Sequence, residues 1–189
     1  MMRLLSIDPS LRGTGFAILE NAERVLRCLH YGVIKNPPSL SVPEALLRID
    51  NVLCVLIEEY QPEMIVLESV IYVQSYSTAI LLGAARGVVL LLAAKEKLPI
   101  HEYPPKRVKQ AVVGHGGATK NQVAFMVRAL LGLRETPPSD AADAMAIGLT
   151  HLRTQALVLP EGRGKKSRAT SWKKFLEQSE KTQKLVIPS

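Results

Sequence analysis

Residues 64–68 have the sequence Met-Ile-Val-Leu-Glu, an apolar run without polar interruption that ends at an acidic residue. A strand with one face in water alternates apolar and polar side chains, whereas a strand covered on both faces is apolar throughout. The run therefore predicts a central strand over residues 64–67, in a sheet that carries helices on both sides.

Segments on both sides of this run complete an α/β pattern. Strands are predicted over residues 3–7, 16–20, 25–34, 64–67 and 99–103, with a tight connection at Gly13-Thr14-Gly15. Helices are predicted over residues 43–60, 77–96, 108–113 and 140–152, with one more beginning after Thr119. Thr119 and Gln122 have the spacing of a capping box, which marks the start of that helix. This order predicts a mixed five-stranded sheet flanked by helices.

Positive charge is concentrated toward the end of the sequence. The 189 residues include 24 Lys and Arg against 17 Asp and Glu, which gives a formal charge of +7 and a pI near 9.5. Between Arg153 and Ser189, nine basic residues stand against three acidic ones. We therefore predict a globular domain over residues 1–155 and a flexible basic tail over residues 156–189. The charge favours a nucleic acid as partner, although a basic enzyme without one would have the same composition.

Cys28 and Cys54 are the only cysteines, and both lie in apolar runs. Two such residues provide neither a disulfide framework nor a zinc site, so we expect reduced core residues in a cytoplasmic, nucleoid-associated protein. The most apolar stretch, residues 79–94, is interrupted by Arg86 and two glycines. It is too short for a membrane span, and we interpret it as a buried helix.

Four acidic residues occupy strand ends and one helix start. Asp8 follows the first predicted strand and Glu68 the fourth, so parallel pairing would bring both side chains to one edge of the sheet. Asp140 and Asp143 are three residues apart, so a helix projects them from one face. Carboxylates gathered in this way repel one another unless a cation lies among them, and Mg²⁺ prefers such oxygen ligands. Two such ions stabilise the attacking and leaving oxygens of a phosphodiester displacement.

Each of these acids also has a structural interpretation. Asp8-Pro9 is an ordinary opening of a turn. Asp140 can serve as the N-cap of its helix, with Asp143 favoured by the helix dipole. Glu68 is harder to explain in this way, because it directly follows a fully apolar strand. The joint placement of the four acids is what favours a metal-dependent active site.

The stretches around these acids form an ordered set of motifs. They are Ser6-Ile7-Asp8-Pro9 with Gly13-Thr14-Gly15, Val66-Leu67-Glu68-Ser69-Val70, and residues 82–87, 108–114 and 140–146. Together they resemble the RuvC family of crossover-junction endodeoxyribonucleases over residues 3–151. The resemblance implies an RNase H-like fold, an active site with two Mg²⁺ or Mn²⁺ ions, and a homodimer. It also implies paired, symmetric nicks across a four-way junction, with a branch-migration helicase complex as a further partner.

The resemblance assigns roles to individual residues. The family's four catalytic acids correspond to Asp8, Glu68, Asp140 and Asp143. Lys109 and Lys120 correspond to basic positions associated with DNA contact. The chain departs from the family at an aromatic position near the junction centre, where it has Ile71, with Tyr72 immediately following.

Further residues around the acids are candidates for DNA contact. Lys106, Arg107 and Lys109 precede a glycine-rich loop in which Gly116 allows a phosphate to approach the backbone, and Lys120 lies in the next helical turn. The alternative for these lysines is a solvated face.

Aromatic residues follow the second acid. Tyr72 and Tyr76 lie between Glu68 and the next helix, where they either stack on unpaired bases or pack that helix onto the sheet.

The helix over residues 77–96 is more apolar than one sheet face requires. We predict that its surplus face forms the seam of a dimer, with the residues Leu81, Leu82, Val88, Val89 and Leu92. Arg86 is expected to pair with an acid or to reach this seam, and His151 to lie on the surface or at the end of its helix. Two other functions remain open: a different RNase H-fold nuclease, and a junction-binding protein without cleavage. A sugar-kinase-like ATPase domain would need more chain and further phosphate loops than these 189 residues provide.

Overall fold

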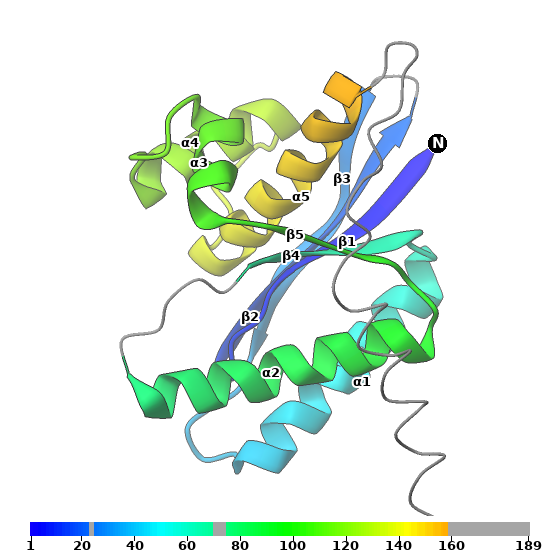
Figure 1. Cartoon of the computed structure of the whole chain (residues 1–189), viewed down its shortest axis with the longest axis vertical. Coiled ribbons are helices and arrows are strands. Elements are labelled where there is room, and N and C mark those ends of the chain that lie inside the picture. The colour runs from blue at the N-terminus through cyan, green and yellow to red at the C-terminus, as the bar shows by residue number, and fades with distance from the viewer. Residues whose placement is uncertain (23–24, 70–74, 159–189) are drawn as a thin grey trace, which may run out of the picture. The chain divides into compact units, whose positions relative to one another are not determined.

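The computed structural model describes residues 1–22, 25–69 and 75–158. Its strands are β1 (Met2–Asp8), β2 (Gly13–Ala22), β3 (Val25–Lys35), β4 (Met64–Glu68) and β5 (Ile100–Tyr103). Its helices are α1 (Val42–Tyr60), α2 (Tyr76–Lys95), α3 (Pro105–Val113), α4 (Lys120–Leu131) and α5 (Ser139–Val158). Each predicted strand and helix has a counterpart among these elements (Figure 1). The predicted domain boundary at residue 155 falls inside α5, and the basic tail beyond Val158 lies outside the described residues.

The five strands form one mixed sheet in the order β3-β2-β1-β4-β5. Strands β1, β2 and β3 pair antiparallel, whereas β4 pairs parallel to β1 and to β5. The glycine-containing segment Gly13-Thr14-Gly15 was predicted to be a connection, and this prediction is wrong. The segment belongs to β2, where Gly15 pairs with Asp8 and Gly13 with Lys35.

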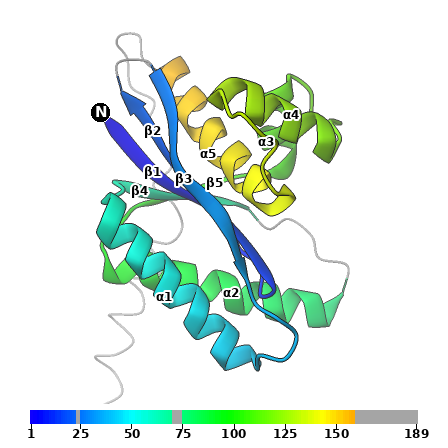
Figure 2. The same cartoon turned by 180° about the vertical axis from the view of Figure 1, so that it is seen from behind.

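Helices cover both faces of the sheet. Helices α1 and α2 lie on one face, and α3, α4 and α5 lie on the other (Figures 1 and 2). In β4, Ile65 and Leu67 belong to the core cluster on the α1 and α2 side, while Val66 belongs to the cluster that includes α5. All three side chains are fully buried. The interpretation of residues 64–67 as a strand covered on both faces is therefore confirmed.

Helix α2 is buried on one side only. It is long and apolar enough to cross a membrane by length and composition, and 22% of its most apolar window is buried. Ala85, Val89 and Leu92 pack into the core, but Ile80 and Leu91 are 71% and 56% exposed. The prediction of a buried helix is therefore wrong for much of its surface, because a helix beside a sheet buries one stripe of side chains.

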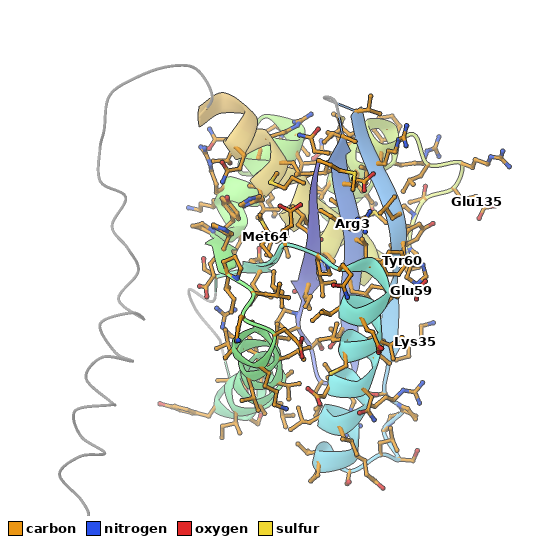
Figure 3. All side chains as sticks on the ribbon, turned by 90° about the vertical axis from the view of Figure 1, so that its right-hand side faces the viewer. Arg3, Lys35, Glu59, Tyr60, Met64 and Glu135 are labelled. Atoms are coloured by element: carbon orange, nitrogen blue, oxygen red, sulfur yellow. The ribbon has the colours of Figure 1, made fainter. Side chains whose placement is uncertain are left out.

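Arg3 holds three elements together at the start of β1. Its guanidinium forms an ion pair with Glu20 of β2 at 2.8 Å and donates to the backbone carbonyl oxygen of Tyr60, the last residue of α1 (Figure 3). Arg3 lies five residues before Asp8, which corresponds to about 16 Å along an extended strand. This contact is therefore remote from the strand ends that carry the acidic residues.

Candidate active site

Asp8 and Glu68 leave the sheet at the same edge. Strands β1 and β4 are parallel neighbours, and their pairing runs from Leu4 with Met64 to Ile7 with Leu67. Each acid is the residue directly after the last of these pairs. The predicted adjacency of the two acidic strand ends is therefore confirmed, and both carboxylates lie at the carboxyl ends of central strands.

Helix α5 brings the other two acids to this edge. Its first turn lies against β2, where a Cβ atom built on Gly15 would be 1.9 Å from the backbone carbonyl oxygen of Asp140. A Cβ atom on Gly13 would be 2.8 Å from the carboxylate oxygen Oδ2 of Asp140. Because Gly15 pairs with Asp8, this close approach places Asp140 beside the end of β1. Asp140 is the second residue of α5, so the alternative that it serves as the N-cap is wrong.

The pKa values of Asp8 and Glu68 show that the carboxylates interact. Burial is the largest cause that raises the pKa of Asp8 to about 7, followed by the charges of Asp143 and Glu68, with a smaller contribution from Asp140. Burial also raises the pKa of Glu68, and the charge of Asp143 acts in the same direction. Burial and the neighbouring negative charges act in the same direction, because each disfavours the charged form of a carboxyl group.

Lys120 contributes positive charge to this acidic region. Its ammonium group donates to Oδ2 of Asp143 at 3.0 Å, and this hydrogen bond is the largest cause that raises the pKa of Lys120. The charge of Lys120 also lowers the pKa of Asp8 and of Glu68. The predicted capping box of Thr119 and Gln122 is present: Thr119 is the N-cap of α4, and Lys120 is the first residue of this helix.

The donor set fits hard divalent cations, although the side chains do not form a finished cage. Within residues 1–22, 25–69 and 75–158, no three acidic, histidine or cysteine side chains converge on a common point. Four carboxylates without a cation repel one another, and Asp143 is bonded to Lys120. Burial and the negative charges of Asp143 and Glu68 disfavour the charged form of Asp8, and a divalent cation bound nearby would favour it. Oxygen-only ligands of this kind suit Mg²⁺ and Mn²⁺.

Three of the candidate DNA-contact residues, Lys106, Arg107 and Lys109, lie on α3. Lys109 is close enough to Glu68 for its charge to lower the pKa of that residue. Lys106 and Arg107 are exposed on α3, and Lys106 packs beside Gly116. A Cβ atom on Gly116 would have only ordinary contacts, from 3.5 Å, so packing does not require glycine at this position.

The aromatic candidates are resolved in part. Tyr76 begins α2 and is 92% exposed, so the alternative that it packs this helix onto the sheet is wrong. Ile71 and Tyr72 lie outside the described residues.

The structure confirms the prediction for Arg86 and contradicts the prediction for His151. Arg86 pairs with the acid Glu102 at 2.5 Å, which confirms one of its two predicted alternatives. His151 was predicted to be a surface residue, and this is wrong: its side chain is fully buried and bonded through Nδ1 to the hydroxyl group of Tyr103 at 3.0 Å. Because Tyr103 belongs to β5, this histidine faces the sheet, and it does not end the helix, because α5 continues to Val158.

A mixed five-stranded sheet with carboxylates at the ends of its central strands and at the start of its last helix defines an RNase H-like nuclease. The chain belongs to the RuvC family: the model of this family, crossover junction endodeoxyribonuclease RuvC, matches residues 4–151. The resemblance seen in the sequence is thus confirmed. Enzymes of this family are metal-dependent nucleases.

Relatives and solved structures agree on this assignment. The crossover junction endodeoxyribonuclease RuvC of Akkermansia muciniphila is 55% identical over 151 residues, which cover 80% of this chain and 90% of the relative. That of Pelobacter propionicus is 40% identical over 174 residues, covering 92% and 99%. The structure of Thermus thermophilus RuvC in complex with a Holliday junction substrate superimposes with a TM-score of 0.78 at 35% identity, covering 84% and 97%.

Proposed function

We propose that this chain resolves Holliday junctions by hydrolysing one phosphodiester bond in each of two opposed strands. The supporting observation is the raised pKa of Asp8 among three further carboxylates at the end of two parallel strands. A site of this kind suits a reaction in which cations, and not a protein nucleophile, meet the phosphate. The family and the fold agree with this function.

The four acids would hold two divalent cations, Mg²⁺ or Mn²⁺. Once bound, such a pair stabilises the charge on the attacking and the leaving oxygen of a phosphodiester. Asp8 and Glu68 supply carboxylates from β1 and β4, and Asp140 and Asp143 supply them from α5. A cation near Asp8 favours its charged form and so reverses the shift that burial imposes.

The basic face beside the acids would bind the DNA backbone. Residues 104–131, which include α3 and α4, contain Lys106, Arg107, Lys109, Lys120 and Arg128 and no acidic residue. Lysine and arginine side chains bind phosphates without regard to base sequence. Lys120 bonds Asp143 in this structure, so it can transfer a hydrogen bond to a substrate phosphate when cations neutralise that carboxylate. Tyr76 is exposed at the start of α2, where it can stack on an unpaired base.

A homodimer would supply two active sites related by a two-fold axis, as two opposed nicks require. The exposed apolar side chains of α2 support this arrangement. They are Ile80, Leu81 and Leu91. Val89 and Leu92 were also predicted to belong to the seam, and this is wrong, because both are buried in the core. Sedimentation of the DNA-free protein at micromolar concentration tests the proposal, and a monomeric mass would count against it. A branch-migration helicase complex is proposed as a further partner.

The deciding experiment is cleavage of a synthetic four-way junction in Mg²⁺ and in EDTA, with products mapped on each strand. We expect paired nicks at symmetric positions in Mg²⁺ and none in EDTA. Asp8→Asn should abolish the nicks and leave junction binding largely intact, because the lysines contact DNA and the acids hold metal. Binding without cleavage would favour a purely architectural protein, and cleavage restricted to RNA–DNA hybrids would favour a different RNase H-fold nuclease.

A further inference from the structure

The backbone of Glu68 lies where the sheet ladder ends. Pairing of β4 with β1 stops at Leu67, and pairing with β5 stops at Glu68 itself, which lies opposite Tyr103. The amide of Ser69 still donates to the carbonyl oxygen of Tyr103 at 2.9 Å. The sheet therefore holds the Glu68–Ser69 peptide through its N–H group, while its carbonyl oxygen, that of Glu68, lies beyond the last pair with β1.

Arg86 supplies the donor at this border. From the middle of α2, its guanidinium donates to the backbone carbonyl oxygen of Glu68 at 3.0 Å through Nη1. Its other terminal nitrogen, Nη2, donates to the carboxylate of Glu102 on β5 at 2.5 Å. The Arg86 side chain is 15% exposed, whereas that of Glu102 is 41% exposed, so the bond to the Glu68 carbonyl oxygen is better shielded from water than the bond to Glu102. One planar group thus joins α2, the end of β4 and β5, which the fork geometry of arginine allows and a single ammonium group does not.

We propose that Arg86 is a positioning residue for Glu68. By bonding the peptide from which the Glu68 carboxylate projects, it fixes the direction of that carboxylate toward Asp8 and Asp143, and Glu102 holds the guanidinium in place. Arg86 bonds the backbone of Glu68 and makes no contact with substrate in this role. The inference rests on the proposed function, because it treats Glu68 as a metal ligand.

Arg86→Met removes both hydrogen bonds while it keeps much of the apolar stem. Partners that orient a metal ligand typically change metal affinity or activity by about 10- to 100-fold when they are removed. We expect a loss of this order in the single-turnover rate of junction cleavage at saturating DNA. Junction affinity in EDTA should stay within about twofold, because the backbone phosphates are bound elsewhere on the protein. Mn²⁺ affinity, measured by calorimetry without DNA, should fall as well.

A matched control is available at the opposite end of β1. Arg3 also joins a carboxylate, that of Glu20, to a backbone carbonyl oxygen, that of Tyr60 (Figure 3). Arg3→Met should lower the melting temperature and leave the cleavage rate and Mn²⁺ affinity of the folded protein unchanged. Arg86→Lys keeps a charged donor group on a single nitrogen and should recover part of the rate lost in Arg86→Met. It also decides the question if Arg86→Met does not fold.

The outcomes separate this inference from the proposed function. If the wild-type protein cuts junctions and Arg86→Met retains its rate and Mn²⁺ affinity within twofold, the positioning role is refuted. Equal losses in Arg3→Met would also refute it, because a general loosening of the sheet would then explain both. If the wild-type protein does not cut junctions in Mg²⁺ or Mn²⁺, the proposed function fails, and the calorimetric comparison still tests whether Arg86 organises Glu68.

Discussion

Replacing Asp8 by Asn should stabilise the protein when no metal is bound, although it removes a proposed metal ligand. The pKa of Asp8 is raised from 3.8 to about 7 by burial, by Asp143 and by Glu68. A carboxyl group whose pKa is higher in the folded state binds more protons there than in the unfolded chain. The stability of the wild-type protein should therefore fall as the pH rises from about 4 to 7. Asn cannot ionise, so the variant avoids this loss.

The magnitude follows from the shift. Each pKa unit corresponds to about 1.4 kcal/mol, so the shift from 3.8 to about 7 sets an upper limit of about 4 kcal/mol above pH 7. Solvent screening, relaxation of the site and the cost of burying an amide reduce the expected gain to about 1–2 kcal/mol. For a chain of 189 residues this corresponds to a rise in melting temperature of about 2–8 °C.

Thermal unfolding in EDTA at pH 4.5 and at pH 8 measures this effect. The difference between Asp8→Asn and the wild-type protein should be small at pH 4.5 and full at pH 8. Addition of Mg²⁺ should stabilise the wild-type protein more than the variant, because a ligand stabilises the state that binds it. Asp50→Asn on α1 is the control and should show neither trend. A variant that is less stable than the wild-type protein in EDTA at pH 8 would refute the electrostatic reasoning.

Three other measurements test separate features. Gly15→Ala should lower the melting temperature strongly, because its Cβ atom would meet a carbonyl oxygen of α5, whereas Gly87→Ala, with no atom within 4 Å, should be neutral or stabilising by about 1 kcal/mol. Burial lowers the pKa of His151 from 6.5 to about 4, so stability should fall as the pH drops from about 6.5 to 4, and His151→Gln should flatten that slope in denaturant titrations. Removal of residues 161–189 should weaken binding to duplex and junction by similar factors and flatten both salt dependences, while cleavage at saturating DNA persists.

Most of the correct predictions about the fold and the site came from the pattern of apolar residues in the strands. An apolar run without alternation specifies burial on both faces, and this alone placed residues 64–67 in the centre of the sheet. Parallel pairing with β1 then brings Asp8 and Glu68 together, since parallel strands end at the same edge. The acids could be proposed from these local signals because two of them end strands and the other two lie near the start of a helix.

Contacts between elements that are distant in the sequence could not be predicted from local sequence patterns. Helix α2 is apolar around most of its surface, so its periodicity could not show that Val89 faces the core and Ile80 faces outward. His151 has no local signal for burial, which is imposed by the strand beneath α5. The pairing of Lys120 with Asp143 joins two helices across the site and depends on how both pack on the sheet.

The glycines of β2 show why local signals mislead at the site itself. Glycine in a sequence marks either a turn or a place where another backbone comes close, and the two meanings cannot be separated until the partner is known. Here the partner is the first turn of α5, whose Asp140 carbonyl oxygen would lie 1.9 Å from a Cβ atom on Gly15. Gly15 also pairs with Asp8, so one contact sets both the packing of α5 and the distance between two of the acids. A side chain at this position would have to move the helix, and with it the carboxylates that the helix carries.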